Sequence, residues 1–494
     1  MTSSDLSPPR LSDPGLLSSR ALIGGRWADA GSGAVFDVVN PATGAVIGRV
    51  PDMGVAETRE AIAAAAAAFP AWRRRTALER GRILRRMSEL MIANVEDLAL
   101  IMTCEQGKPL AESRGEIAYA ASFLEWFAEE GRRVYGEIIP PNIPGRRILT
   151  TREPIGVFAA ITPWNFPSAM ITRKAAPAWA AGCTGVIRPA NQTPLSALAL
   201  GVLAERAGLP AGVCNIVTGD PVAIGAELTG SATVRKVSFT GSTRVGAILL
   251  AQCAPTIKKT SMELGGNAPF IVFDDADLDL AVEGAMVAKF RNAGQTCVCA
   301  NRLLVQTGVH DAFVARLKAR VEALVCGDGL QGGVTQGPLI DAGAVHKVAN
   351  YVEDAVSKGA RCVAGGRPVR EAWFEPTVLV DTPTTALCFR EEIFGPVAPI
   401  FRFETEEEAI ALANDTEFGL ASYLYTSDLA RAFRVAEALE CGIVGVNEGL
   451  ISTEVAPFGG VKSSGLGREG SRHGIEDYLE IKYIGIGGIG RPLV

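Results

Sequence analysis

Hydrophobic and polar positions repeat with two different periods along this chain, and the alternation between the periods predicts its architecture. Between residues 156 and 263, short apolar runs typical of buried strands alternate with helical stretches at intervals of about 25 to 30 residues, as in βαβ units. Right-handed crossovers arrange such units as a doubly wound parallel sheet, whose ligand site lies beyond the carboxyl ends of the strands. The predicted strands are 156–161, 184–188, 213–217, 236–239 and 260–263, and the predicted helices are 169–181, 194–207, 222–228 and 244–254.

A second α/β pattern occupies much of the carboxyl-terminal half of the chain. Its strand-like runs are at 270–273, 303–305, 397–403, 421–425 and 443–446, and its helical stretches are at 311–325 and 344–358. Before the first sheet, four alanine- and leucine-rich stretches are predicted to be helical, at 55–72, 76–94, 96–106 and 113–135. A glycine-punctuated cap at 21–50 is predicted to be rich in strand.

Two further segments alternate like exposed strands although they lie far apart in the sequence. One is 147–151, which follows a proline-rich stretch, and the other is 478–486. We predict that they build a small β arm for oligomerisation and that the tail strand is exchanged between chains, so that deletion from Tyr478 onward would leave a monomer. The predicted fold class is therefore α/β, with a doubly wound parallel sheet, a second α/β domain and a small β arm.

Composition narrows the class of protein. The chain has 494 residues, more than the roughly 250–300 at which single cores stop growing, so two or three domains are expected. A net charge of −6 argues against a nucleic-acid binder and against a basic membrane-surface protein. Residues 1–20 lack a basic region followed by an apolar one, so they are predicted to be a disordered leader rather than a signal peptide.

Cysteine and histidine usage predicts a reducing compartment and no metal site. The ten cysteines are scattered without the density of a small secreted domain, so we place the protein in the cytoplasm. The three histidines are not combined with cysteines at the spacing of a zinc site.

One cysteine lies in a connection, where chemistry is more common than in core elements. Cys297 follows a helical pattern that stops at Phe290 and precedes the strand-like run at 303–305. Asn165 and Ser242 each follow a predicted strand of the first sheet, and Glu263 ends another, so all three are expected at the same end of that sheet. An amide there can serve as an oxyanion donor, a carboxylate as a general base, and a helix N-terminus as an anion site. Taken singly, each also has an ordinary interpretation: an inert buried thiol, a turn asparagine, a surface glutamate, or a plain turn.

Together these motifs resemble the aldehyde dehydrogenase superfamily from about Ala21 to Ile484. The resemblance rests on six motifs in the right order, at 163–167, 239–246, 262–267, 294–297, 392–396 and 457–460. It implies that 21–136 and 156–264 form the NAD(P)-binding domain, 265–460 the catalytic domain, and 137–155 with 478–494 the oligomerisation arm. It also implies a homo-oligomer, either a dimer or a dimer of dimers.

The resemblance implies a role for each motif residue. Cys297 would attack the aldehyde carbon, Asn165 and the Cys297 backbone N–H would hold the oxyanion, and Glu263 would activate water against the thioester. Ser242 would contact the pyrophosphate, and Glu392 and Phe394 would hold the nicotinamide ribose and ring. The other cofactor contacts expected are Thr162, Trp164, Arg188, Ala190, Asn191, Gly241 and Leu264.

Within the superfamily the chain is most similar to succinate-semialdehyde dehydrogenases. Arg173, Arg291 and Ser452 match that subfamily's contacts to the substrate carboxylate, and a bidentate arginine is the natural carboxylate clamp. Phe166 and Phe458 are expected beside the substrate. Cys299 matches a second thiol that forms a reversible disulfide with the nucleophile, and an i, i+2 pair would be strained and labile. Equal, irreversible inactivation of wild type and Cys299→Ala by peroxide would exclude such a gate.

One departure from the superfamily bears on the cofactor. Many members have Lys-Pro-x-Glu after the second strand, and this chain has Arg-Pro-Ala-Asn at 188–191. Loss of the carboxylate removes repulsion toward a 2′-phosphate, and Arg188 adds a guanidinium beside it. We therefore predict NADP as the preferred cofactor and leave NAD use open.

The sequence thus predicts an enzyme that oxidises a small ω-carboxy aldehyde, with succinate semialdehyde as the main candidate. Glutarate semialdehyde stays open, because one methylene is worth only about 1–3 kcal/mol of discrimination. A CoA-acylating enzyme is disfavoured because Glu263 supplies a base for hydrolysis. A catalytically silent nucleotide-binding protein of the same fold is the alternative from another class, and Cys297, Glu263 and Asn165 together argue against it. No nucleic-acid or membrane partner is expected.

Overall fold

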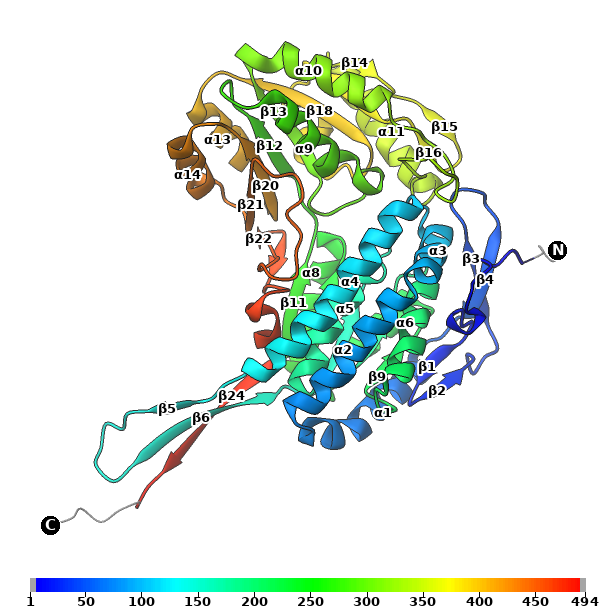
Figure 1. Ribbon diagram of the computed structural model, residues 1–494, viewed down its shortest axis with the longest axis vertical. Helices are drawn as coiled ribbons and strands as arrows, with labels where there is room; N and C mark the ends of the chain where they lie inside the picture. The colour runs from blue at the N-terminus through cyan, green and yellow to red at the C-terminus, as the bar shows by residue number, and fades with distance from the viewer. Residues whose placement is uncertain (1–5, 489–494) are drawn as a thin grey trace.

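The computed structural model describes residues 6–488, and the lower half of the molecule in Figure 1 is built on an eight-stranded sheet. Its order is β2-β1-β9-β8-β7-β10-β11-β23, and the five strands from β9 to β11 run parallel. The chain moves outward in one direction from β7 and in the other from β10, so the switch point lies between these two strands. The strands are β1 (Ala21–Ile23), β2 (Arg26–Ala28), β7 (Val157–Ile161), β8 (Thr184–Arg188), β9 (Cys214–Ile216), β10 (Val234–Thr240), β11 (Lys259–Glu263) and β23 (Gly465–Leu466).

Helices cover both faces of this sheet. The apolar sides of α1, α7 and α8 pack on one face, and those of α2 to α6 pack on the other. Helix α5 is buried along its whole length, so it carries polar side chains into the centre of the molecule. The helices are α1 (Val55–Arg74), α2 (Ala77–Ala93), α3 (Val95–Gln106), α4 (Leu110–Glu130), α5 (Ala169–Ala181), α6 (Pro194–Ala207), α7 (Pro221–Gly230) and α8 (Thr243–Cys253).

The upper half of Figure 1 contains a second, seven-stranded sheet in the order β14-β17-β18-β13-β12-β20-β21. All neighbours are parallel except β14 and β17, and helices pack on both faces. The predicted α/β class with a doubly wound parallel sheet is therefore confirmed. The elements are β12 (Ala268–Val272), α9 (Leu278–Phe290), β13 (Ala300–Gln306), α10 (Thr307–Glu322), α11 (Ala342–Ser357), β14 (Arg361–Ala364), β17 (Thr377–Val380), α12 (Leu387–Arg390), β18 (Val397–Phe403), α13 (Glu406–Asn414), β20 (Ala421–Tyr425), α14 (Leu429–Ala438) and β21 (Ile443–Val446).

Short elements complete the described chain. A hairpin of β3 and β4 lies in the strand-rich cap, and paired short strands lie in loops of the upper half. None of the helices in residues 6–488 has both the length and the apolarity needed to cross a membrane. The short elements are β3 (Val35–Val39), β4 (Val46–Pro51), β15 (Pro368–Arg370), β16 (Trp373–Phe374), β19 (Phe418–Gly419), β22 (Val461–Lys462) and the 3-10 helices η1 (Pro14–Leu16), η2 (Gly131–Arg133), η3 (Ala254–Thr256), η4 (Arg291–Gly294) and η5 (Arg472–Tyr478).

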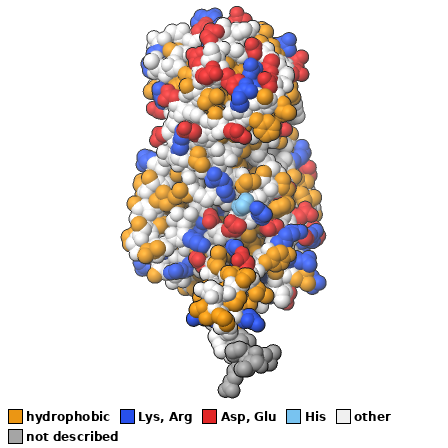
Figure 2. All heavy atoms as spheres, turned by 90° about the vertical axis from the view of Figure 1, so that its left-hand side faces the viewer, with side chains coloured by type: hydrophobic (Ala, Val, Ile, Leu, Met, Phe, Trp, Pro, Cys, Tyr) orange, Lys and Arg blue, Asp and Glu red, His pale blue; other side chains and the backbone are white. Residues whose placement is uncertain are grey.

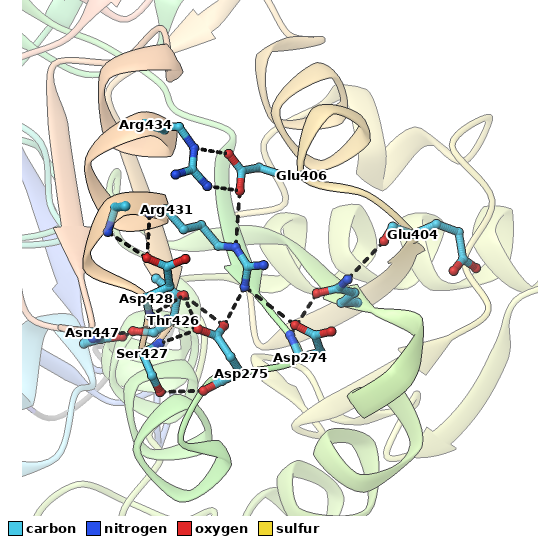
Figure 3. A network of polar contacts seen from close by, with 12 residues as sticks. Asp274, Asp275, Glu404, Glu406, Thr426, Ser427, Asp428, Arg431, Arg434 and Asn447 are labelled. Carbon is cyan, nitrogen blue, oxygen red and sulfur yellow. Dashed lines mark hydrogen bonds and ion pairs between the residues drawn. The ribbon is translucent and has the colours of Figure 1, made fainter.

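A polar network lies at the carboxyl ends of strands β12 and β20 of the second sheet (Figure 3). Arg431 on α14 pairs with Asp275, after β12, at 2.7 Å and with Glu406 on α13 at 3.2 Å. Asp275 also accepts bonds from the Thr426 hydroxyl and the Asp428 backbone N–H. Burial raises the pKa of Asp275, but these bonds and Arg431 hold it below its usual range. The network therefore ties the ends of β12 and β20 to both outer helices.

A β arm extends away from the body at the segments predicted for it (Figure 1), and its role in oligomerisation stays a prediction. It is a three-stranded antiparallel sheet of β5 (Glu137–Ile139), β6 (Arg147–Pro154) and β24 (Leu479–Ile486) in the order β24-β6-β5. The prediction of an exchanged tail strand differs from the structure, because all of β24 pairs with β6 of the same chain, and their ladder satisfies both strands locally. Residues 489–494 of the predicted arm lie outside the described chain. Hydrophobic side chains gather toward the lower end of the molecule in Figure 2, where the arm lies. Ile138 on β5 is 77% exposed, and Tyr483 on β24 is 63% exposed.

The prediction of a disordered leader over residues 1–20 is corrected by the structure from residue 6 onward. From residue 6 onward the segment is described, and Leu16 is wholly buried in the core of the first half. The backbone N–H groups of Ser12 and Asp13 each donate to the Asp97 carboxylate at 2.8 Å. Asp97 lies on α3, far away in sequence, so local composition gave no sign of these contacts. Residues 1–5 lie outside the described chain.

Candidate active site

Three predicted catalytic residues meet between the two sheets. Asn165 follows β7, Glu263 ends β11, and Cys297 lies in the loop between η4 and β13. The Asn165 Nδ2 donates to the backbone carbonyl of Gln295 at 3.0 Å, which ties the first domain to the cysteine loop. A Cβ at Gly266 would lie 2.4 Å from the Cys297 carbonyl oxygen, so only glycine permits this close approach. The switch point of the first sheet is therefore faced by the cysteine loop of the second.

The cysteine loop has a strained backbone that polar contacts hold in place. Asn292, Ala293 and Gly294 all have positive φ, at 52°, 53° and 74°. The Asn292 backbone N–H donates to Glu112 at 2.8 Å, and its Nδ2 donates to the Asn165 carbonyl at 3.0 Å. Left-handed non-glycine residues persist only where their surroundings fix them, and they concentrate at functional sites. Helix α9 ends at Phe290, as predicted, and the strained turn that follows it leads directly to Cys297.

Electrostatics keep the resting nucleophile and base away from their charged forms. Cys297 is partly exposed, yet burial raises the pKa of its thiol to about 12, with Arg173 opposing and Glu263 adding to the shift. Glu263 is buried, and within the described chain neither carboxylate oxygen has a hydrogen-bond partner. Burial and the nearby Glu469 raise the pKa of Glu263 well above its usual range, against Arg173 and Lys174. This environment differs from that of a solvated surface glutamate and suits a general base.

The raised pKa of the Cys297 thiol predicts a steep pH dependence. Only the thiolate reacts, so the rate constant for alkylation of Cys297 by iodoacetamide should rise about tenfold per pH unit and show no plateau below pH 9. The rise continues because the pKa of about 12 lies above that range. Rates are measured by peptide mass spectrometry at Cys297, with Cys297→Ala as the blank. A plateau near pH 7 would contradict the protonated resting thiol.

Two arginines near this centre have buried N–H groups with no partner. Arg173 on α5 donates from Nε to Glu469 at 2.7 Å and stacks 3.9 Å over the Phe458 ring, while its Nη2 has no partner within residues 6–488. Arg291 lies 5.4 Å from the Phe166 ring centre, and its Nε is likewise without a partner in the described part. Unpaired buried donors are costly, and an anionic ligand would satisfy them. Ser452 is partly exposed and makes no hydrogen bond to any described residue.

The predicted phosphate loop has the geometry of an anion site. Ser242 is the N-cap of α8, and its side chain accepts from the Val245 N–H at 3.4 Å. A Cβ at Gly241 would lie 2.4 Å from the Phe239 ring, and one at Gly246 would lie 2.5 Å from Leu264. Glycine therefore lets the backbone lie close to its neighbours at both ends of the turn, and the first N–H groups of α8 are available to a phosphate.

The predicted adenosine side lies at the end of β8. Arg188 donates from Nη2 to Asn191 at 2.6 Å and to the Gly219 carbonyl at 3.3 Å, while its Nε has no partner in the described chain. Burial lowers the pKa of Arg188 to about 10, so it remains a cation at neutral pH. Ala190, which lies between Arg188 and Asn191 in the sequence, is also buried. A cation with a free donor and no carboxylate at position 191 fits a 2′-phosphate.

The predicted nicotinamide side is built from both domains. Glu392 accepts from the Gly266 N–H at 3.1 Å, and burial raises the pKa of its carboxyl to about 7. Phe394 has a left-handed backbone, with φ of 55°, and its ring meets Trp164 edge-on at 5.6 Å. The Thr162 hydroxyl is buried without a partner in residues 6–488. These orphaned polar atoms and the glycine turn fit a dinucleotide cofactor.

Sequence reasoning missed a buried ion cluster behind the base. Glu469 accepts from Arg173 and from Lys174, and all three side chains are nearly inaccessible to solvent. Burial raises the pKa of Glu469, but Lys174 and Arg173 outweigh it and bring it to about 2. Tyr119 belongs to the same cluster. Burial raises the pKa of its hydroxyl, and the nearby Arg173 opposes that shift. Glu469 lies 296 positions from Arg173, and no local pattern marks it.

The predicted redox thiol has an unexpected partner. Cys299 is buried, and Lys289 on α9 donates from Nζ to its Sγ at 3.3 Å. Its Sγ also lies 3.5 Å from the Lys289 carbonyl oxygen. A disulfide with Cys297 would therefore require Cys299 to leave Lys289.

Comparisons with known proteins find close similarity over nearly the whole chain. The sequence model described as "Aldehyde dehydrogenase family" matches residues 27–484. A glutarate-semialdehyde dehydrogenase of Pseudomonas aeruginosa is 64% identical, covering 97% of this chain and 100% of that protein. The succinate-semialdehyde dehydrogenase [NADP(+)] GabD of Escherichia coli is 62% identical, with coverage of 97% and 100%. The solved structure of a succinate-semialdehyde dehydrogenase from Burkholderia pseudomallei superposes with a TM-score of 0.96 at 60% identity, covering 97% of this chain and 99% of that one.

Proposed function

The chain belongs to the aldehyde dehydrogenase family, and from that premise we propose that it oxidises succinate semialdehyde to succinate, with NADP as the preferred cofactor. The observation that carries the substrate class is the pair of arginines, buried Arg173 and half-buried Arg291, each of which has a buried N–H group without a partner in residues 6–488 that suits a carboxylate. Both arginines act electrostatically on Cys297, so the carboxylate end and the reacting end of a short aldehyde fit the same site.

The residues of the site divide the reaction between them. The Cys297 thiol loses its proton to water, and its sulfur then bonds to the aldehyde carbon as the C=O π electrons move to oxygen. The resulting oxyanion accepts from Asn165 Nδ2 and the Cys297 N–H. Glu392 and Phe394 would hold a nicotinamide beside Cys297, and that group would supply the hydride acceptor needed for the oxyanion to collapse to a thioester. Glu263 then removes a proton from water, whose oxygen attacks the thioester carbon while the C–S bond breaks. The products are the acid and the free thiol.

Glutarate semialdehyde is the second candidate, because the first relative described above is named for it. The two substrates differ by one methylene, and both end in the carboxylate that the arginines would hold. The test is kcat/KM for aldehydes of three to six carbons, with and without a terminal carboxylate, using NADP. We expect a preference for succinate semialdehyde and far weaker use of butanal. Equal use of charged and neutral aldehydes would contradict the proposal.

Replacing Asn191 by glutamate should reverse the cofactor preference. The added carboxylate would lie within reach of Arg188 and would face the 2′-phosphate of NADP. Like charges in contact cost several kcal/mol, so kcat/KM for NADP should fall about 10- to 100-fold while that for NAD is maintained or rises. The control is Asn191→Gln, which keeps the amide and should keep the preference. If Asn191→Glu leaves the ratio of kcat/KM for NADP to that for NAD unchanged, the site at Arg188 does not bind the 2′-phosphate.

We also propose that Cys299 gates the nucleophile and that the arm joins chains into a homo-oligomer. The closeness of Cys297 and Cys299 in the sequence supports the gate, and the contact of Cys299 with Lys289 is that of the reduced thiol.

The exposed side chains of Ile138, Ile481 and Tyr483 on the arm support association of chains, since such side chains gain most from burial against another copy. The ten unpaired cysteines support a reducing, cytoplasmic location.

A further inference from the structure

A buried polar cluster lies beneath the loop that carries Asn165, and the reaction described above does not use it. Its centre is Lys108, which follows Gly107 at the turn between α3 and α4, where φ of Gly107 is 95°. The Lys108 Nζ donates to Glu116 at 2.6 Å and to the backbone carbonyl of Asn165 at 2.7 Å. The Lys108 and Glu116 side chains are each only 1% exposed. A lysine this deeply buried is rare unless its contacts fix it.

The partner of Lys108 holds the other end of the same loop. One oxygen of Glu116 accepts from Lys108, and the other accepts from the backbone N–H groups of Ser168 and Ala169, at 3.0 and 3.2 Å. These N–H groups lie at the start of α5, where a helix lacks internal partners and favours a negative charge. The ion pair therefore brackets residues 165 to 169 from both ends.

Lys108 also contacts the aromatic ring next to Asn165. Its Nζ lies 4.1 Å from the centre of the Phe166 ring, and Arg291 lies 5.4 Å from the same ring. Cations are attracted to ring faces, and the attraction is stronger away from water. Phe166 is thus held by one buried cation of the scaffold and by one arginine of the substrate site.

We propose that Lys108, together with Glu116, is a positioning residue for the oxyanion donor. It touches neither substrate nor cofactor. By fixing the Asn165 carbonyl and the Phe166 ring, it fixes where the Asn165 carboxamide lies when an oxyanion forms at Cys297. Oxyanion stabilisation depends on donors placed within a few tenths of an ångström, so a loose loop would lose much of it. The proposal deepens the proposed function and rests on it for the role of Asn165.

The test separates positioning from damage to the fold. Lys108→Met alone leaves Glu116 buried and unpaired, which destabilises the protein. The double variant Lys108→Met/Glu116→Gln removes both charges and keeps an acceptor for Ser168 and Ala169. We expect its melting temperature and NADPH affinity to stay close to wild type. The rate constant of the NADPH burst with succinate semialdehyde should fall about 10- to 100-fold, part of the loss seen when an oxyanion donor is deleted.

Two further measurements distinguish the positioning role from a general one. Alkylation of Cys297 by iodoacetamide, which needs no oxyanion hole, should stay within about twofold of wild type. In an Asn165→Ala background the added effect of the double substitution should disappear, because residues that act through one another are not additive. An unchanged burst, an equal loss in alkylation, or additive effects would each overturn the proposal. Absence of any NADPH formation by the wild-type enzyme with succinate semialdehyde would instead contradict the proposed function.

Discussion

Glu263→Gln is expected to lower steady-state NADPH production by about 10²- to 10⁴-fold, the usual contribution of a general base. The amplitude of the first burst, one NADPH per active site, should survive, because the thioester can still form but is no longer hydrolysed at a useful rate. Glutamine has the shape of glutamate, and within residues 6–488 neither Glu263 oxygen makes a hydrogen bond that the substitution would break. The variant also removes a buried carboxylate near Glu469, so its melting temperature should not fall.

Stopped-flow absorbance measures the burst and the steady state in one experiment, and mass spectrometry detects the acyl group trapped on Cys297. The matched control is Cys297→Ala, which should give neither a burst nor an acylated protein. A second control is Glu417→Gln, a glutamate outside the site, which should behave as wild type. Undiminished steady-state turnover by Glu263→Gln would show that another group activates the water. Complete loss of the acyl adduct would show that Glu263 is needed to form the thioester as well as to hydrolyse it.

The elements that the sequence predicted best are those with sharp local boundaries. Helix α5 is followed by Gly182, which is left-handed with φ of 101°, and α6 begins with Pro194 and is followed by Gly208 with φ of 89°. Both helices run over the predicted residues, as do β8, β18, β20 and β21. Proline at a first helical position and glycine after a last one are signals that a single sequence carries. Two-residue strands such as β23 exist only because β11 offers an edge, so no local pattern announces them.

The same distinction applies to the site. Asn165, Glu263 and Cys297 each lie where a regular element ends, and the topology of a parallel sheet brings such ends together. Glu469 and Lys108 were missed because their roles come from contacts with chain segments far away in sequence. Lys108 donates to the Asn165 carbonyl, which is 57 positions away in the sequence, and Glu469 accepts from Arg173, which is 296 positions away. Long-range polar pairs of this kind follow from the folded structure and not from spacing.

The second large effect is expected at the substrate carboxylate. Arg291→Gln should lower kcat/KM for succinate semialdehyde by about 30- to 10³-fold, since deleting one partner of a buried charge pair costs about 2–4 kcal/mol. Arg291 is the cleaner of the two arginines to test. It has no ion-pair partner among the described residues, whereas Arg173 also holds Glu469, and its loss would disturb the ions around the base.

The neutral aldehyde butanal isolates the carboxylate contact from the chemistry. Because butanal offers nothing for Arg291 to bind, its kcat/KM should change by less than about threefold in the variant. Arg320→Gln, an exposed arginine of α10 paired with Glu283, serves as the matched control and should leave both aldehydes unaffected. An equal loss for both aldehydes in Arg291→Gln would mean that Arg291 supports Phe166 and the cysteine loop rather than the substrate. A loss confined to succinate semialdehyde would instead place the substrate carboxylate at the end of α9. The loss of kcat/KM in the same variant, compared between succinate and glutarate semialdehyde, would then show which chain length places its carboxylate at Arg291 while its aldehyde carbon reaches Cys297.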